Sequence, residues 1–472
     1  MEENEMKSAV KENIMGTRKI PHLLFSVSVP IIISMLVQAL YNVVDSIYVS
    51  RFDNIAGTGA LTIAFPIQNL IIAVSVGLAV GTNALLSRAL GEKNSDKVDR
   101  VAGQGFFLML AGYSLFLIFG LFLLKPYILS SDVAAGSLLY EYSYDYISIV
   151  TLLSIGVFIQ VICERLLQAT GKALLSMICQ LSGAVVNIIL DPILIFGMLG
   201  APSLGVKGAA IATVVGQFVA AALGLIFNFT QNREIKFKLK NLIPQPKLLG
   251  EMLAIGIPAV FMQAIGSITT YFMNKILIVF SEEALNIFGI YFKLQSFVFM
   301  PVFGLTNGMV PIIAYNYGAK SRPRVVATIR LGMISAVSYM LLGLLAFQLV
   351  PSLLLGMFNA SALMLEIGVV ALRNLSWSFL LAGMSVVSIA SCQAFGKSIY
   401  SLIVSAIRQL VVLIPAAFLL SKTEILELVW FAFPIAELVG FAVAISLFLY
   451  ALNKCMPKEK PTAAAVLELD NQ

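Results

Sequence analysis

Long apolar stretches alternate with short polar connections along the whole chain. Charged residues are absent from the stretches at 20–44, 54–87, 101–124, 252–274, 294–319 and 331–365. An α-helix needs about 20 apolar residues to cross the hydrocarbon core of a bilayer. Each stretch is long enough, so the pattern predicts membrane-spanning helices rather than the core of a water-soluble protein.

The apolar stretches and the polar connections between them predict an all-α membrane protein with twelve transmembrane helices. The composition agrees, because 59% of the 472 residues are hydrophobic and 12% are charged, against roughly a quarter charged in soluble domains. We expect the helices at about 22–48, 61–88, 101–123, 143–163, 173–198, 208–229, 250–280, 284–313, 326–350, 366–393, 399–420 and 429–452.

Basic residues predict how the helices are oriented. The two ends of the chain and the even-numbered connections hold 23 lysines and arginines, whereas the odd-numbered connections hold 4. Such residues favour the cytoplasmic side. We therefore expect a multi-pass protein of the plasma membrane, of the bacterial inner-membrane type, with both termini in the cytoplasm. The net charge of +6 is then an orientation signal, and we expect no nucleic-acid partner.

The sequence repeats itself at a spacing of about 224–228 residues. Val29-Pro30 reappears as Ile257-Pro258, and the run 168–172 reappears at 393–397. The repeat predicts two pseudo-symmetric six-helix bundles. The expected organisation is an N-terminal lobe at 1–230, a basic cytoplasmic linker at 231–247, a C-terminal lobe at 248–453 and a polar cytoplasmic tail at 454–472. Two lobes that rock about a central cavity are typical of secondary transporters, whereas a channel more usually assembles several chains.

Two aspartates interrupt the apolar segments of the first half. Asp45 and Asp191 both follow the cytoplasmic start of their helix by about 20 residues, so we expect them at similar depth. Asn187 precedes Asp191 by one turn and shares its face, and Pro192 frees a backbone carbonyl. These oxygens predict a pocket for Na⁺ as a hard cation, or for a bound proton. Alternatively, each aspartate lies at a helix end and faces water.

The second half lacks this acidic pair and carries Glu437 with four basic residues inside its helices. One of the basic residues is expected to pair with Glu437 as a structural bridge, and the alternative is that Glu437 or Lys293 binds substrate. Aromatic, amide and charged residues of both halves are candidates for a substrate cavity: Tyr41, Phe65, Gln68, Tyr291, Lys293, Gln295 and Glu437.

Several function classes have no support in the sequence. The phosphate loop of ATP-driven pumps is absent, and so is the H-E-x-x-H motif of metalloproteases. His22 is the single histidine, and the four cysteines form no C-x-x-C pair. We therefore expect no enzyme activity and no cofactor.

Five segments resemble the multidrug and toxic compound extrusion (MATE) family, closest to its MepA-like branch. They are Ser87–Lys93, Leu167–Lys172, Asn187–Gly197, Gly208–Thr213 and Val310–Tyr317. The resemblance implies a two-bundle antiporter that exports cationic or amphiphilic organic compounds, driven by inward flow of Na⁺ or H⁺.

The resemblance also implies a cation site in the first lobe. Asp45, Asn187, Asp191 and Thr213 match the residue types of the family's site, whereas the acids that some branches place on helices 7 and 10 are missing. A flippase for a lipid-linked or amphiphilic metabolite is the alternative, although such a protein should line its cavity with several basic residues. We expect the transporter to act as a monomer.

Overall fold

The computed structural model describes residues 13–53, 55–131, 133–358 and 361–457, and every regular element within them is helical. The first half contains α1 (Ile14–Thr17), α2 (Ile20–Phe52), α3 (Ala56–Gly91), α4 (Ser95–Ile118), η1 (Phe119–Leu123), α5 (Leu124–Leu129), α6 (Leu138–Leu152), α7 (Ile155–Ala169), α8 (Ala173–Phe196), η2 (Met198–Gly200) and α9 (Val206–Thr230). After the short helix η3 (Leu239–Leu242), the second half contains α10 (Pro246–Leu277), α11 (Glu282–Gly318), α12 (Arg322–Leu349), α13 (Pro351–Gly356), α14 (Ala362–Ser376), α15 (Phe379–Ala394), α16 (Ser398–Ala406), η4 (Ile407–Leu413), α17 (Ile414–Ser421), α18 (Leu426–Val429) and α19 (Ala432–Cys455).

The predicted spans are found within a few residues of their expected positions. Ten helical segments of the described chain are long and apolar enough to cross a membrane, and two bent pairs bring the number to twelve. The bent pairs are α6 with α7, at 44°, and α14 with α15, at 45°. The first and last residues of the chain, including most of the predicted tail at 454–472, lie outside the described residues.

The two bends repeat the internal symmetry in three dimensions. At the first bend the Ser154 hydroxyl donates to the carbonyl of Thr151, at 2.8 Å, and at the second Ser378 donates to Leu375, at 2.6 Å. Both pairs are 224 residues apart, which is the spacing of the sequence repeat. A serine hydroxyl that bonds a carbonyl of the preceding turn favours a bend, so the same local chemistry bends the fourth and tenth spans.

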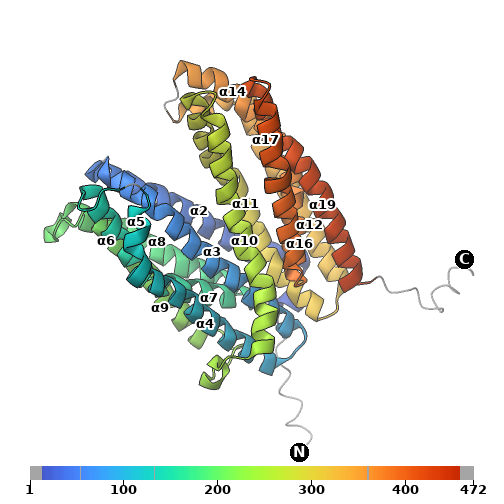
Figure 1. Cartoon of the computed structure of the whole chain (residues 1–472). Helices are drawn as coiled ribbons and strands as arrows, with labels where there is room; N and C mark the ends of the chain where they lie inside the picture. Colours follow the sequence, from blue (N-terminus) through green and yellow to red (C-terminus); the bar gives the residue numbers. More distant parts are fainter. Residues whose placement is uncertain (1–12, 54, 132, 359–360, 458–472) are drawn as a thin grey trace, which may run out of the picture.

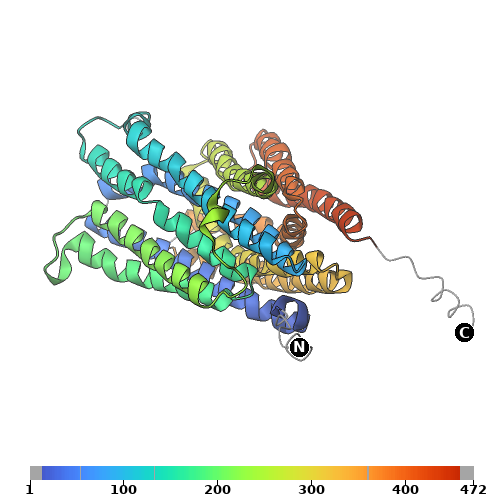
Figure 2. The same ribbon diagram turned by 90° about the horizontal axis from the view of Figure 1, so that it is seen from below.

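The spans form two bundles, as the repeat predicts (Figure 1). We call α2–α9 the N-lobe and α10–α19 the C-lobe. Seen from below, the helices of the first half lie mainly on one side of the view and those of the second half on the other, and the two groups overlap where they meet (Figure 2). The N-lobe packs around buried residues such as Phe158 and Tyr146, and the C-lobe packs around Phe288, Phe347 and Trp430. The fold is therefore the expected pair of pseudo-symmetric bundles.

Glycines bring the lobes into backbone contact toward the end that carries most basic residues. A Cβ atom on Gly81 of α3 would lie 2.3 Å from the Met252 carbonyl oxygen of α10. A Cβ on Gly91 would lie 1.9 Å from the Tyr315 carbonyl oxygen of α11. Small residues permit this approach, and close packing is the main attraction between helices in lipid. The lobes are thus sealed against each other at this end.

The start of the chain also ties the lobes together. The Asn13 amide donates to the Thr170 carbonyl of the N-lobe, at 3.3 Å. The Asn316 amide and the Arg324 guanidinium of the C-lobe donate to the Met15 carbonyl, at 3.1 and 3.0 Å. The other described end lies nearby, because Arg322 donates to the Met456 carbonyl at 2.8 Å. Both ends of the described chain therefore lie on one side of the bundles.

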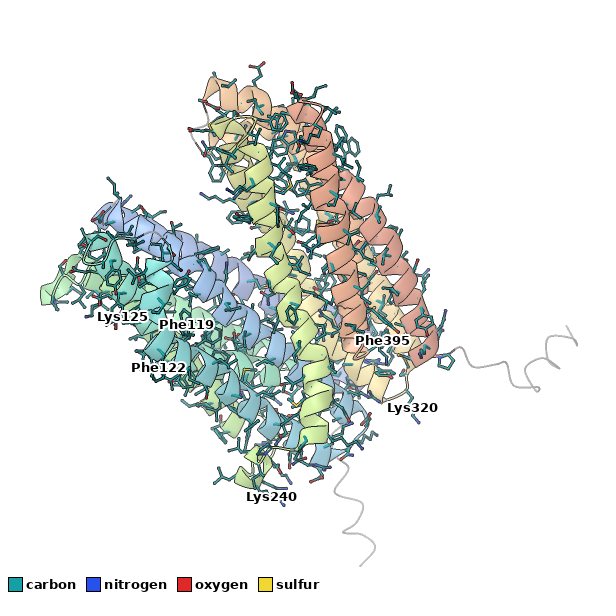
Figure 3. The ribbon with its side chains drawn as sticks, viewed as in Figure 1. Phe119, Phe122, Lys125, Lys240, Lys320 and Phe395 are labelled. Atoms are coloured by element: carbon teal, nitrogen blue, oxygen red, sulfur yellow. The ribbon has the colours of Figure 1, made fainter. Side chains whose placement is uncertain are left out.

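The side that holds the chain ends is also the basic side. Figure 3 shows Lys240 of the linker and Lys320 between α11 and α12 at the lower end of the view, whereas Lys125 lies toward the other end of the N-lobe. The charge pattern of the sequence thus corresponds to a real polarity of the folded molecule.

The glycine seam predicts that Gly81→Ala destabilises the protein. The added methyl group collides with backbone, and overpacking costs about 1–3 kcal/mol or more. Gly266→Ala is the matched control, because it lies inside α10 with open space around it and gains up to about 1 kcal/mol in helix propensity. The melting temperatures of the two variants, measured in detergent, should shift in opposite directions from that of the parent protein. Equal melting temperatures would contradict a tight seam.

Candidate cation-coupling site

Asp45 and Asp191 lie within continuous helices rather than at helix ends. α2 continues past Asp45 to Phe52, and α8 continues past Asp191 to Phe196 despite Pro192. Asp191 has no exposed surface, and one carboxylate oxygen of Asp45 is buried. The two carboxyl groups are close enough to repel each other when both are charged. The alternative in which each acid simply faces water is therefore wrong for Asp191.

An amide connects Asp191 to the neighbouring helix. The Asn187 side chain donates to Asp191 Oδ1, at 3.3 Å, and to Thr213 Oγ1 of α9, at 3.4 Å. Two glycines permit this contact: a Cβ on Gly216 would lie 2.6 Å from the Gly183 carbonyl, and a Cβ on Gly183 would lie 2.7 Å from that of Gly216. Gly216 lies one turn after Thr213, so the tight α8–α9 crossing sets the position of the threonine hydroxyl.

Three oxygen atoms of this cluster accept no hydrogen bond. Asp45 Oδ1, Asn187 Oδ1 and Asp191 Oδ2 are all buried without a donor. The ion pairs among the described residues do not include either aspartate. Unpaired buried oxygens are costly. Oxygen atoms are also the ligands that hard cations prefer, so the donor set fits Na⁺ or protons on the carboxylates.

Two tyrosines and a glutamine extend the polar cluster across the N-lobe. Tyr41 and Tyr146 both lie within electrostatic range of Asp45 and Asp191. Tyr146 is buried, and its hydroxyl accepts a hydrogen bond from Gln68 Nε2 at 2.9 Å. The structure thus brings together Tyr41 and Gln68, two of the candidate cavity residues, beside the acids.

Glu164 is a buried acid that the sequence analysis missed. It was placed just beyond a helix predicted to end at residue 163, whereas α7 continues to Ala169 and only 8% of Glu164 is exposed. Within the described part of the chain, its side chain accepts a hydrogen bond from Gln160 Nε2, at 2.9 Å. Tyr41 lies within electrostatic range of Glu164 as well. Gln160 and Glu164 are one helical turn apart in the sequence, and this spacing is the signal from which their contact could have been predicted.

Arg165 follows the span predicted at 143–163, and it lies inside α7 because that helix continues to Ala169. One of its guanidinium nitrogens donates to Gln168 Oε1 and to Asn307 Oδ1 of α11, both at 3.1 Å. Asn307 belongs to the C-lobe, so this contact crosses between the lobes. It places a polar link between the lobes next to a buried acid of the N-lobe.

In the C-lobe the expected bridge to Glu437 is confirmed. Arg408 Nη1 lies 3.0 Å from Glu437 Oε1, and both side chains are mostly buried. Arg408 belongs to the π-helical segment η4, and Gly440 on α19 leaves room for its methylene groups, because a Cβ there would lie 2.8 Å from Arg408 Cγ. The acid of this lobe therefore has a permanent counter-charge, unlike the aspartates of the N-lobe.

The remaining cavity candidates are spread over different environments. Tyr291 is fully buried among aromatic side chains of the C-lobe core. Lys293 is exposed, with its ammonium 5.9 Å from the centre of the Phe358 ring. Phe65 is 61% exposed and lines an open hollow with Thr58, Leu61 and Thr62. Gln295 is half-buried.

The Arg408–Glu437 pair predicts an asymmetric response to substitution. Breaking a buried pair from one side leaves an uncompensated charge and costs about 3–5 kcal/mol. Arg408→Met should therefore lower the stability strongly, and adding Glu437→Leu should recover most of the loss. Lys293→Gln, at an exposed position, is the control. A double mutant less stable than Arg408→Met, measured by thermal unfolding, would argue against a structural bridge.

Comparison with known proteins gives the family. The family model MatE matches residues 30–193 and 258–419. The multidrug export protein MepA of Staphylococcus haemolyticus is 28% identical and covers 94% of this chain and 95% of that protein. A Staphylococcus aureus MepA is 30% identical and covers 90% of this chain and 92% of that protein.

Solved structures have the same fold. An outward-facing MATE transporter has a TM-score of 0.87 at 23% identity, covering 95% of this chain and 99% of that one. A MATE structure in complex with MaL6 has a TM-score of 0.88, also at 23% identity, covering 95% of this chain and all of that one. The chain is a multi-pass membrane protein, and it belongs to the MatE family.

Proposed function

We propose that this chain is a secondary antiporter that exports cationic or amphiphilic organic compounds in exchange for Na⁺ or H⁺. The observation that carries the proposal is the set of three buried oxygens without a donor, on Asp45, Asn187 and Asp191. Its relatives of similar length are named multidrug export proteins, which supports the substrate class and argues against an enzyme. The working unit is a monomer in the plasma membrane.

Cation binding and lobe motion are coupled through the cost of burying charge. When the coupling site is empty, Asp45 and Asp191 favour a conformation in which water reaches them. A bound cation or proton compensates the carboxylates and permits their burial. A ligand shifts a conformational equilibrium by its difference in affinity for the two states, so ion binding at this pocket drives the two lobes between their open and closed arrangements.

The direction of transport follows from the polarity of the molecule. The sealed end holds both ends of the described chain and most basic residues, and the positive-inside rule assigns that end to the cytoplasm. The structure then corresponds to a state closed toward the cytoplasm. Inward flow of the coupling ion would drive the lobes back to the opposite arrangement, and the organic substrate would be carried outward.

The substrate surface lies next to the ion site in this proposal. Tyr41, Phe65 and Gln68 supply aromatic and amide groups on the N-lobe, and Glu164 adds a buried carboxylate that attracts cations. Across the lobes, the second half contributes the exposed Lys293 and the half-buried Gln295, whereas Tyr291 is buried in the core and Glu437 is paired with Arg408. Arg408 is neutralised by Glu437, so one of the four basic residues inside the C-lobe helices already has a counter-charge. That observation favours cationic substrates over the lipid-linked phosphates of a flippase.

Neutralising either aspartate should abolish coupled export. Asp45→Asn and Asp191→Asn keep the shape of the side chain and remove its charge, so the proteins should fold normally while ethidium efflux from energised vesicles falls to the level of vesicles without the transporter. Asp145→Asn is the matched control, because Asp145 is half-exposed and pairs loosely with Lys207, at 3.8 Å. Undiminished efflux in both site variants would refute the coupling site.

An imposed ion gradient should drive transport in proteoliposomes without ATP. A Na⁺ gradient and a pH gradient are applied separately, and one of them should move a cationic dye against the dye's own concentration gradient. The gradient that drives this movement identifies the coupling ion. Asp191→Asn should respond to neither gradient. Dye movement that ignores both gradients in the unsubstituted protein would contradict an antiport mechanism.

A further inference from the structure

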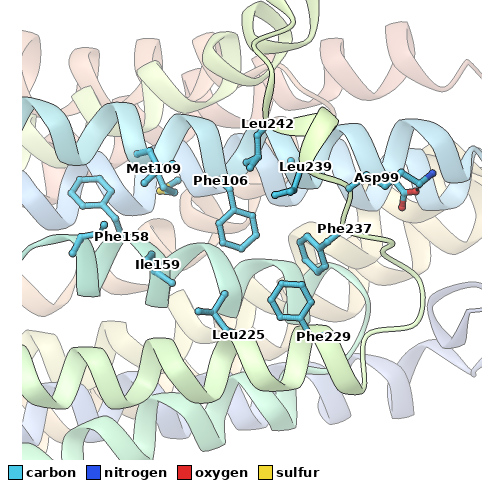
Figure 4. Close-up of a pocket in the computed structure, with 14 residues that line it drawn as sticks. Asp99, Phe106, Met109, Phe158, Ile159, Leu225, Phe229, Phe237, Leu239 and Leu242 are labelled. Atoms are coloured by element: carbon cyan, nitrogen blue, oxygen red, sulfur yellow. Dashed lines mark ion pairs between the residues drawn. The ribbon is translucent and has the colours of Figure 1, made fainter.

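An apolar groove runs along the outside of the N-lobe, away from the acids. It has a volume of about 470 Å³ and lies between α4, α7, α9 and the linker. Figure 4 shows Met109 and Phe158 at one end of the groove, Phe106 and Phe229 along it, and Asp99 at the other end. Apart from Asp99 and Lys238, the residues that line the groove are apolar, so the groove suits a hydrocarbon ligand.

The linker forms a fixed wall of this groove. The Gln104 amide of α4 donates to the carbonyls of Asn241 and Ile243, at 2.6 and 2.7 Å, and its oxygen accepts from the Gln245 N–H at 2.8 Å. A Cβ on Gly103 would lie 2.5 Å from the Asn241 carbonyl, so the backbones touch. The linker is therefore docked rather than loosely tethered.

This docked linker turns apolar side chains toward the groove. Phe237, Leu239 and Leu242 line it, and Leu239 is 86% exposed. The ring of Phe237 lies 4.8 Å from that of Phe229 on α9. A basic connection that presents large apolar side chains beside the membrane-facing surface is suited to the boundary between lipid headgroups and acyl chains.

Positive charge gathers at the end of the groove near Asp99. Lys238 lies 3.4 Å from Asp99, and the backbone N–H of Lys236 donates to the same carboxylate at 2.7 Å. Lys236, Lys238 and Lys240 all have exposed side chains. The nearby acid Glu234 is already paired with Lys172. Asp99 thus pairs with the ammonium of Lys238, whereas the exposed Lys236 and Lys240 on the same linker add positive charge that is suited to an anion.

We propose that the groove binds an anionic phospholipid, with one acyl chain along the groove and the headgroup phosphate against Lys236, Lys238 and Lys240. Asp99 and Met109 are ten residues apart on one helix, so the groove is about 15 Å long at 1.5 Å per residue. That length is about half of the roughly 30 Å hydrocarbon core, which is one leaflet. Basic pockets at the ends of membrane helices bind acidic headgroups in this way.

The proposed lipid site is separate from the transport pathway. The lysines repel the organic cations that the transporter is proposed to export, so those substrates are poor occupants. A zwitterionic lipid would fill the groove but gain little from the three lysines. The identity of the headgroup is therefore the property that a test must measure.

Tryptophan fluorescence offers a direct test, because Trp377 and Trp430 are the two tryptophans of the chain and both belong to the C-lobe. Phe229→Trp places a reporter at the groove, at a position that is 64% exposed. The protein is reconstituted into phosphatidylcholine nanodiscs that contain increasing fractions of dibrominated phosphatidylglycerol or dibrominated phosphatidylcholine. Quenching of the reporter is obtained by subtracting the signal of the parent protein.

Half-maximal quenching should require at least about five-fold less brominated phosphatidylglycerol than brominated phosphatidylcholine. Replacing Lys236, Lys238 and Lys240 with alanine should remove that preference, whereas the matched replacement of Lys247, Arg330 and Lys397 should retain it. Ile159→Phe, which narrows the groove, should weaken quenching by both lipids. Equal quenching by the two lipids, or a preference that survives the first triple substitution, would overturn the proposal. Dye efflux that depends on Asp45 and Asp191 is measured in a separate experiment. The outcome of the lipid test therefore does not decide the antiport tests.

Discussion

A carboxyl group inside a membrane-spanning helix needs a counter-charge, water or a bound proton, because hydrocarbon offers it no compensation. The two lobes meet this requirement differently although they share one architecture. In the C-lobe, Arg408 compensates Glu437 within the protein. In the N-lobe, Asp45 and Asp191 have no such ion pair among the described residues, and one carboxylate oxygen of each has no donor. In the proposed mechanism a cation or proton from outside the chain supplies the compensation, so that ion binding in the N-lobe controls conformation.

Close helix packing holds this polar cluster in place. The reciprocal contact of Gly183 and Gly216 lets α8 and α9 approach, and the approach lets Asn187 reach Thr213. Glycines serve a second purpose where the lobes meet, because Gly81 and Gly91 allow backbone contact across the seam. Contacts of this kind involve no bulky side chains that must interlock. Their use at the seam fits a surface that must separate and close again as the lobes move.

Polar side-chain contacts also cross the seam between the lobes. Arg165 lies beside Glu164 in α7 and reaches Asn307 in the C-lobe. The start of the chain contributes a second crossing, in which Met15 accepts hydrogen bonds from C-lobe residues while Asn13 contacts the N-lobe. Opening the sealed end requires breaking these bonds together with the glycine contacts. The linker that joins the two lobes is docked on α4 through Gln104.

The sequence by itself determined the number and order of the spans and predicts their orientation, because apolar length and the placement of lysine and arginine are local properties of the chain. It also indicated Asp45, Asn187 and Asp191, since a charged or amide group in an apolar run stands out without any knowledge of contacts. The ends of helices were harder to predict, and Glu164 was missed because charge near a helix end resembles the start of a connection. Only the tertiary structure decided which groups meet. The pairing of Arg408 with Glu437, the contact between Arg165 and Asn307, and the groove beneath the linker each join residues from different helices, and such contacts depend on how the helices pack.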